Sequence, residues 1–409
     1  MKSEKTRVGD LAVFGGRPTF RAPFHVGQPN IPDRNKLLDR IGDALERKWL
    51  TNNGPYVREL ERRIAELLGV NHCIAMCNGT VALEIAIRAL DLSGEVILPS
   101  MTFVATAHAL QWQQITPVFC DIEPGTFNID PDSVEELITE KTTGIIGVHL
   151  WGQPCAVDRL AEVASRRNLK LIYDAAHAFH CSLQGRMIGS FGDAEVFSFH
   201  ATKFFNTFEG GAIVTNNEVL AQKIRFMKNF GFAGYDCVEH IGTNGKMNEI
   251  SAAMGLTGLE EIDNTIAINR RNYRQYGKEL NGVEGVRLLE YDEAETSNYQ
   301  YIVTEVPDAL PISRDQLVQM LWAENVRARR YFYPGCHRME PYRSLYPKAA
   351  DRLPLTERAV TRTMALPTGA AVSEEDVARI CALIRLAMEY GDEIASRLKE
   401  TCAGEIVGV

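Results

Sequence analysis

The chain lacks the cysteine spacings that staple small folds or bind zinc. It contains nine cysteines, yet no Cys-x-x-Cys pair occurs, and the group His177, His180 and Cys181 completes no closed set of four ligands. We therefore expect neither a disulfide scaffold nor a metal site. Cysteines scattered through apolar segments are typical of free thiols in a reducing compartment, which predicts a cytoplasmic protein.

Long apolar runs and basic clusters are also missing. No stretch reaches about eighteen apolar residues, and the first residues lead into no apolar run of signal-peptide length. The formal net charge is −9 and no basic stripe occurs, whereas binding to nucleic acid requires a basic face. We therefore expect neither a membrane nor a nucleic acid as partner.

Apolar strand patterns alternate with helical patterns through the first half of the chain. This alternation predicts an α/β fold with a mainly parallel, seven-stranded sheet that is covered by helices. The expected strands are residues 72–76, 95–98, 116–120, 144–149, 169–173, 194–199 and 211–215. The expected helices are residues 55–68, 80–90, 103–112, 132–138 and 156–167.

The pattern changes after residue 246. We expect a long helix over residues 247–281 and then a smaller α+β region. Its expected strands are residues 298–306 and 326–332, and its expected helices are residues 314–324, 355–363 and 374–398. The sequence therefore predicts a large domain with an N-terminal arm over residues 1–246 and a small domain over residues 247–409.

Two side chains follow expected strands of the sheet and carry complementary chemistry. Asp174 directly follows the strand 169–173, and Lys203 follows the strand 194–199 about one crossover unit later. Parallel strands place such residues at one edge of the sheet, where ligands bind. A pyridinium cofactor needs an anion at its ring nitrogen and a lysine at its aldehyde. Asp174 and Lys203 are candidates for these groups, although a helix cap and a solvated lysine would read the same way.

Residues 78–80 open an expected helix after the first strand of the sheet. The free N–H groups of such a helix start, the helix dipole and the Thr80 hydroxyl would suit a phosphate group. Helix capping explains the same residues equally well. Phe103 follows another strand and is placed either to stack on a flat cofactor or to join the core.

These segments together resemble the sugar aminotransferases of the DegT/DnrJ/StrS group, which depend on pyridoxal 5′-phosphate (PLP) and belong to the fold type I aminotransferases. The matching segments occur in the family's order between about residues 45 and 265. They are residues 49–55, 78–83, 99–106, 148–154, 174–177, 198–203, 209–212 and 242–250, followed by Ala252 and Ala253.

The resemblance implies a role for each matching residue. Lys203 corresponds to the lysine that forms the Schiff base with PLP and moves the substrate proton, and Asp174 to the partner of the ring nitrogen. The position of Asn244 implies a phosphate contact from the neighbouring subunit, and hence a homodimer with shared active sites. The remaining implied cofactor contacts are Gly79, Thr80 and Ser198 at the phosphate, Phe103 on the ring face and His177 beside the phenolic oxygen.

The chain departs from the family pattern at His177 and Lys246. His177 stands where glutamine is common, and it keeps a hydrogen-bond donor while adding a group that titrates. Lys246 stands where arginine is usual, so the charge is kept but the planar fork is lost. Tyr333 and His337 lie in a segment that resembles the family's loop near the sugar, although a packed Pro-Gly turn would look the same. Lys246, Trp151, Tyr333 and His337 are thus the expected substrate contacts.

The resemblance implies an aminotransferase that works by a ping-pong mechanism. It predicts transfer of an amino group from L-glutamate to a nucleotide-activated deoxysugar, with pyridoxamine phosphate as the intermediate form of the cofactor. We expect 4-amination of dTDP-4-keto-6-deoxyglucose. An aminotransferase for a 3-keto sugar nucleotide or a cyclitol is the alternative, and a noncatalytic regulator that binds an aminosugar is a more distant one.

Overall fold

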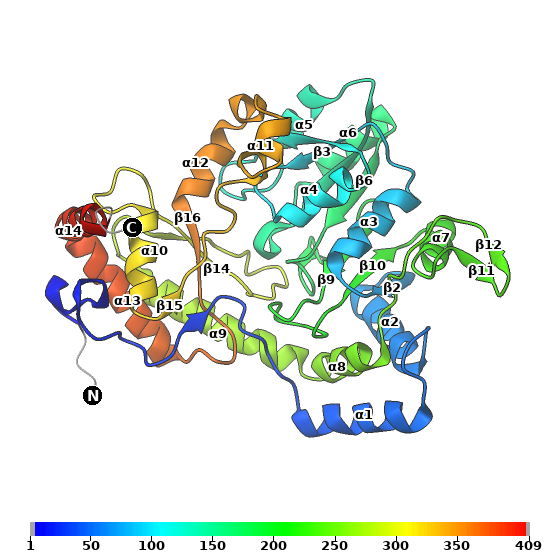
Figure 1. Cartoon of the computed structure of the whole chain (residues 1–409), viewed down its shortest axis with the longest axis horizontal. Helices are drawn as coiled ribbons and strands as arrows, with labels where there is room; N and C mark the ends of the chain where they lie inside the picture. Colours follow the sequence, from blue (N-terminus) through cyan, green and yellow to red (C-terminus); the bar gives the residue numbers. More distant parts are fainter. Residues whose placement is uncertain (1–4, 406–409) are drawn as a thin grey trace.

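The computed structural model describes residues 5–405, and a sheet of seven strands forms its centre (Figure 1). Strand β10 runs antiparallel to both of its neighbours, and the other pairs are parallel. The expected mainly parallel, seven-stranded sheet is therefore confirmed. In spatial order the strands are β2 (His72–Met76), β10 (Gly211–Thr215), β9 (Ala194–Ser198), β6 (Lys170–Asp174), β5 (Thr142–Val148), β3 (Glu95–Pro99) and β4 (Thr116–Cys120).

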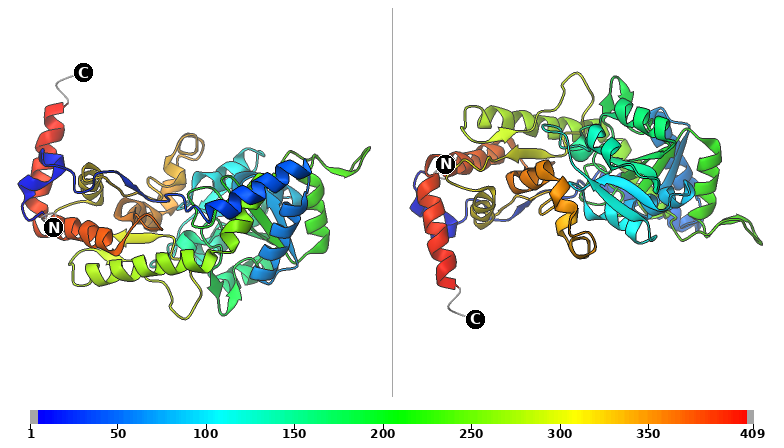
Figure 2. Two further views of the ribbon diagram at one scale, coloured as in Figure 1. Left: turned by 90° about the horizontal axis from the view of Figure 1, so that it is seen from below. Right: turned by 90° about the horizontal axis from the view of Figure 1, so that it is seen from above.

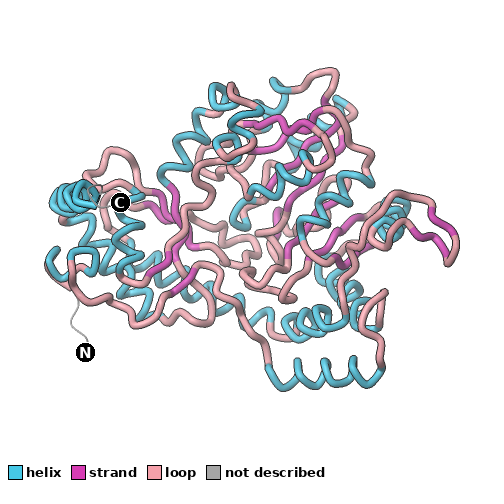
Figure 3. Tube along the Cα trace, in the orientation of Figure 1, coloured by secondary structure: helices cyan, strands magenta, loops and turns pink. Residues whose placement is uncertain are grey.

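Helices cover both faces of this sheet, as Figure 3 shows. Because successive strand residues point to opposite faces, Ile74 and Met76 join one hydrophobic cluster while Cys73 and Ala75 join another. The helices over the first cluster are α3 (Gly79–Ala89), α4 (Val104–Gln111) and α7 (Glu218–Met227). Those on the opposite face are α2 (Pro55–Leu68), α5 (Pro131–Leu137), α6 (Val157–Arg167) and α8 (Glu249–Leu259).

The later part of the chain forms a second core around a three-stranded antiparallel sheet (Figure 2). The early residues Val8, Leu11 and Phe20 pack into this second core. Strand β1 (Phe24–His25) also pairs with β15 (Val326–Arg327). The sheet consists of β13 (Arg287–Leu288), β14 (Ile302–Glu305) and β16 (Thr363–Leu366). The helices are α9 (Ile262–Leu280), α10 (Arg314–Ala323), α12 (Pro354–Arg362), α13 (Glu374–Glu389) and α14 (Gly391–Glu405).

Two helices that were expected to be continuous are each divided into two helices in the structure. The span 247–281 is divided into α8 and α9, because Glu261 leaves the helical conformation with φ −120° and ψ 11°. Helix α8 is buried against α1 and α2, whereas α9 runs on into the second core. The span 374–398 is likewise divided at Tyr390 into α13 and α14. The division into domains 1–246 and 247–409 stays a prediction.

Several elements were not expected from the sequence. The most prominent is a hairpin of two short strands that projects from the body beyond α7 (Figures 1 and 2). The expected strand 326–332 is shortened to β15, because a turn begins soon after it. No helix within residues 5–405 has the length and apolar character to span a bilayer. The unexpected elements include α1 (Arg34–Arg47), α7, β7 (Ser182–Leu183), β8 (Arg186–Met187), β11 (Phe232–Gly234), β12 (Cys237–Val238) and α11 (Tyr342–Leu345).

Candidate active site

A cavity of about 380 Å³ opens where β2, β3, β5, β6 and β9 end. The carboxyl edge of an α/β sheet is the usual place for a ligand site. Residues that are far apart in the sequence meet here because their strands end side by side. The sequence-predicted residues that line the cavity are Gly79, Thr80, Phe103, Asp174, His177, Ser198 and Lys203.

Lys203 lies in the turn after β9, with its amine inside the cavity. Its Nζ donates a hydrogen bond to the Tyr301 hydroxyl at 3.3 Å. Desolvation lowers the pKa of Lys203 from 10.5 to about 8, and the nearby Asp174 carboxylate opposes this shift. The amine is therefore partly deprotonated close to neutral pH, as a nucleophile or proton acceptor must be.

Asp174 is the last residue of β6 and is buried at the bottom of the cavity. Its Oδ2 accepts a hydrogen bond from the Thr106 hydroxyl at 2.8 Å, and its Oδ1 accepts one from the Ala176 N–H at 3.1 Å. Burial raises the pKa of Asp174, while these two donors and Lys203 lower it. The carboxylate is thus fixed in direction and would be stabilised further by a cationic ligand atom.

His177 faces the same cavity as a neutral imidazole. Burial and the charge of Lys203 hold its pKa well below the usual 6.5. Its Nδ1 accepts a hydrogen bond from the Trp151 N–H at 3.2 Å. Since Nδ1 is an acceptor, the proton is assigned to Nε2, which leaves an N–H donor for a ligand oxygen. The ring of Phe332 stacks on His177 with centroids 5.8 Å apart.

The start of α3 forms an anion-binding surface on the cavity wall. Asn78 caps the helix by accepting a hydrogen bond from the Val81 N–H at 2.8 Å. The N–H groups of Gly79 and Thr80 occupy the first helical positions, where no earlier carbonyl of the helix can pair with them. A Cβ at Gly79 would lie 3.0 Å from Cβ of Ser198, so this close approach favours glycine. The Thr80 and Ser198 hydroxyls complete a set of donors suited to a phosphate group.

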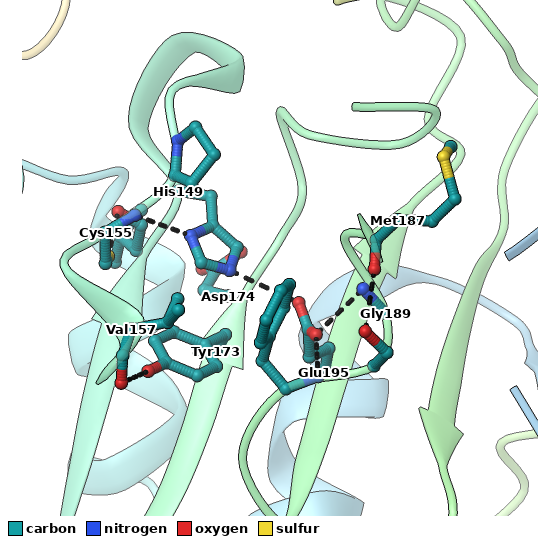
Figure 4. Close-up of polar contacts among 12 residues, drawn as sticks. His149, Cys155, Val157, Tyr173, Asp174, Met187, Gly189 and Glu195 are labelled. Atoms are coloured by element: carbon teal, nitrogen blue, oxygen red, sulfur yellow. Dashed lines mark hydrogen bonds and ion pairs between the residues drawn. The ribbon is translucent and has the colours of Figure 1, made fainter. Parts of the chain in front are cut away.

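A buried His–Glu pair lies behind Asp174 (Figure 4). The N–H of His149 donates to the Asp174 carbonyl at 3.0 Å. The His149 Nε2 lies 3.2 Å from Oε2 of Glu195, and its Nδ1 accepts from the Cys155 N–H at 3.0 Å. Glu195 Oε1 accepts from the Gly189 N–H at 2.8 Å. The pair therefore ties the segment after β5 to β9, and His149 also favours the ionised form of Asp174.

Three expected substrate contacts do not line the cavity. Trp151 is fully buried, and its backbone N–H, rather than its ring, reaches His177. His337 is buried with its Nδ1 2.6 Å from the Ser100 hydroxyl, so it connects its segment to the end of β3. Tyr333 is exposed, and its ring lies beneath the Arg330 guanidinium at 4.9 Å.

Asn244 and Lys246 also lie outside this cavity. Their segment runs beside the end of β2, where Lys246 forms an isolated bridge with Met76. Asn244 is exposed. Lys246 lines a separate hollow of about 190 Å³ that also includes Asn52. Burial and the charge of Lys228 lower the pKa of Lys246.

The sequence reasoning missed three residues of the site. Thr106 holds Asp174, and its signal was its position on the first turn of an expected helix, four residues after Thr102. Tyr301 and Arg329 line the cavity from the later part of the chain. No spacing in that part marks either residue.

The lining fits PLP in each of its functional groups. A helix start with two hydroxyls matches the phosphate, a buried carboxylate matches the ring nitrogen, and an amine of lowered pKa matches the aldehyde. The Nε2–H of His177 matches the phenolic oxygen. Phe103 is 58% exposed, so its ring is available to cover a flat ligand.

Comparison with known proteins gives matches over most of the chain. The model of the DegT/DnrJ/EryC1/StrS aminotransferase family matches residues 32–385. The dTDP-4-amino-4,6-dideoxy-D-glucose transaminase of Escherichia coli is 37% identical over 362 residues, which cover 88% of this chain and 97% of that protein. The GDP-perosamine synthase of Caulobacter vibrioides is 36% identical over 352 residues, with 85% and 94% covered.

Solved structures resemble the chain equally broadly. DesI, in a crystal structure determined in the presence of its TDP-sugar product, superposes with a TM-score of 0.91 at 47% identity, covering 96% of this chain and all of that one. Helicobacter pylori PseC, an aminotransferase involved in the biosynthesis of pseudoaminic acid, gives a TM-score of 0.83 at 26% identity, with 90% and 99% covered.

Proposed function

The chain belongs to the DegT/DnrJ/EryC1/StrS aminotransferase family and is a PLP-dependent sugar aminotransferase; on this premise, we propose that it transfers an amino group from L-glutamate to the 4-keto group of dTDP-4-keto-6-deoxyglucose. The observation that carries the proposal is the meeting of Lys203, Asp174 and the start of α3 in one cavity. The substrate is supported by the names of the similar proteins, one a dTDP-4-amino-4,6-dideoxy-D-glucose transaminase and the other DesI with a TDP-sugar product.

We propose that the cavity residues hold the cofactor at its ends and on its face. The N–H groups of Gly79 and Thr80, with the Thr80 and Ser198 hydroxyls, would bind the phosphate. Phe103 would cover one face of the ring. When bound, PLP supplies an electron-withdrawing ring that stabilises negative charge on the carbon that loses a proton. His177 would donate from Nε2 to the phenolic oxygen, because its Nδ1 is occupied by the Trp151 N–H.

Lys203 is the proposed proton carrier. Its Nζ takes the α-proton of the amino donor in the first half-reaction and moves a proton the opposite way in the second. A pKa of about 8 suits both tasks, because near neutral pH the free amine that takes a proton and the ammonium that gives one are both accessible. The hydrogen bond to Tyr301 holds Nζ inside the cavity between these steps.

Asp174 is the proposed counter-ion of the ring nitrogen. Its two donors, Thr106 and the Ala176 N–H, occupy one lone pair on each oxygen and leave the others for the ligand. A carboxylate fixed in this way needs no rearrangement when the cation arrives, which is the basis of electrostatic preorganisation.

We further propose a homodimer with shared active sites. Asn244 is exposed and outside its own chain's cavity, which suits a contact with the partner's cofactor phosphate. Lys246 lies on the same segment and would approach the partner's substrate. The projecting hairpin and its surroundings expose large apolar side chains that a second subunit would cover. They are Phe230, Phe232, Tyr235, Val238 and Ile241.

The remaining proposals concern the expected substrate contacts, the location of the protein and the division of the chain into domains. We assign no substrate contact to the side chains of Trp151 and His337, because both are buried outside the cavity. Tyr333 is exposed and stays a proposed contact. The cysteines described in the structure are free thiols, which supports the proposed reducing, cytoplasmic location. The boundary between residues 246 and 247 remains our proposed division of the chain.

The proposal is tested by assaying the PLP-loaded enzyme with L-glutamate and a panel of keto sugars. The panel contains dTDP-4-keto-6-deoxyglucose, its 3-keto isomer, a GDP-linked 4-keto sugar and a cyclitol ketone. We expect an aminosugar only from the first, with the amine at carbon 4 by NMR, and none with Lys203→Ala. Faster conversion of any other acceptor would overturn the proposed substrate.

A further inference from the structure

Arg329 lines the cavity that contains Lys203, yet neither the sequence pattern nor the proposed cofactor contacts assign it a role. Its backbone is fixed by two hydrogen bonds with Ala365, N–H to carbonyl at 3.0 Å and carbonyl to N–H at 2.7 Å. Its guanidinium lies over the Tyr331 ring, 5.1 Å from the centroid. The side chain is therefore presented to the cavity from a backbone position that is anchored to β16, and against an aromatic surface.

Arg329 differs from the neighbouring Arg330 in having no acidic partner. Arg330 donates to Asp315 at 3.2 Å, which ties it to the start of α10. Arg327 lies over the Trp322 ring and outside the cavity. Within residues 5–405, no carboxylate lies within ion-pair distance of the Arg329 guanidinium. An exposed arginine in a ligand cavity without an internal anion is suited to binding an anion of the ligand.

The position of Arg329 in the same cavity as Lys203 selects among the anions of the two proposed substrates. The α-carboxylate of an amino acid is bonded to the same carbon whose proton Lys203 removes, so a group that binds it must line the same cavity as Nζ. The diphosphate of the sugar nucleotide is attached to ring carbon 1, across the ring from the keto carbon 4. It would therefore lie away from Nζ when carbon 4 reacts.

We infer that Arg329 binds the α-carboxylate of the amino donor, an inference that rests on the proposed function. The planar guanidinium can donate two parallel hydrogen bonds to a carboxylate, which fixes the direction of the α-carbon. The contact with Tyr331 restricts the rotation of the guanidinium plane before the donor arrives. The keto sugar carries no carboxylate, so Arg329 acts in the half-reaction with the donor alone.

The test separates the two half-reactions of the PLP-loaded enzyme in Arg329→Met and Arg329→Lys, with Arg327→Met as the matched control. Stopped-flow absorbance follows the reaction with L-glutamate, and the amine-loaded enzyme is then reacted with the keto sugar nucleotide. For Arg329→Met we expect the apparent Kd of L-glutamate to rise roughly 10- to 100-fold, as loss of a charged hydrogen-bond pair predicts. Arg329→Lys should lie between this variant and the wild type.

Binding of glutarate supplies a readout without chemistry, because glutarate has the donor's carboxylates but no amine. Calorimetry should show weaker glutarate binding to Arg329→Met and wild-type binding to Arg327→Met, with unchanged melting temperatures. The reaction with the keto sugar should change less than about threefold, within the range of indirect effects. Equal losses in both half-reactions, a loss with the sugar nucleotide alone, or no loss would each overturn the inference. If the wild type binds glutarate but aminates no sugar, the proposed function fails and the glutarate result alone decides on Arg329.

Discussion

Replacing Asp174 by asparagine removes a buried charge while keeping the shape of the side chain. The asparagine carbonyl can still accept from Thr106 or from the Ala176 N–H, so the fold and the phosphate contacts should persist. The ring nitrogen of PLP, however, loses its counter-ion. Breaking a buried ion pair costs about 3–5 kcal/mol, and at 1.36 kcal/mol per tenfold change this predicts a rate loss of about 10²- to 10⁴-fold.

The assay for Asp174→Asn is the single-turnover reaction of the PLP-loaded enzyme with L-glutamate. Cofactor content is measured separately after denaturation, so that a loss of rate is not confused with a loss of PLP. Asp121→Asn is the matched control, because Asp121 is also 6% exposed and accepts from Thr356, and it does not line the cavity. The control should lose stability but not rate. A rate for Asp174→Asn within about threefold of the wild type would refute the role of Asp174, since removal of a buried partner cannot be so small.

Three further predictions concern the same cavity. Thr106→Val removes a hydrogen-bond donor to Asp174, which raises the pKa of that carboxyl. Because activity needs the ionised carboxylate, the acid limb of the pH–rate profile should move to higher pH. The rate should fall about tenfold. In the cofactor-free protein, labelling of Lys203 by an amine reagent should rise with pH around a midpoint near 8 rather than 10.5, and a midpoint above 10 would contradict the burial of its amine. Mixing Asn244→Ala with Lys203→Ala subunits should restore part of the activity, because one of the two mixed sites would keep both residues; no restoration would argue against shared sites.

The sheet was predictable because its strands are short apolar runs with helices between them. Each of the seven lies within two residues of its expected bounds. The helix break at Glu261 was not predictable, because residues 247–281 contain no proline and α8 and α9 pack into different cores. The hairpin was missed because its strands are two or three residues long and exposed, so they carry no alternating pattern.

The cofactor side of the site was easier to predict than the substrate side. Asp174, Ser198 and Gly79 stand directly at strand ends or at a helix start, and a parallel sheet brings such positions to one edge. Tyr301 and Arg329 reach the cavity only because the second core packs against that edge. No local rule relates their spacing to Lys203, so the structure was needed to find them.

The second layer behind Asp174 shows a further limit of sequence patterns. His149 directly follows β5 and Glu195 lies in β9, and each alone reads as an ordinary polar residue near a strand end. In the structure both are fully buried, and the Cys155 N–H donates to His149 Nδ1, which closes the segment from His149 to Cys155. That segment carries the Trp151 N–H that sets the proton of His177 on Nε2. The tautomer of a cavity residue is thus set by a backbone group in a segment that lies outside the cavity. The two side chains hold the backbone around them through other atoms, because His149 Nδ1 accepts from the Cys155 N–H and Glu195 Oε1 accepts from the N–H groups of Gly189 and Phe191.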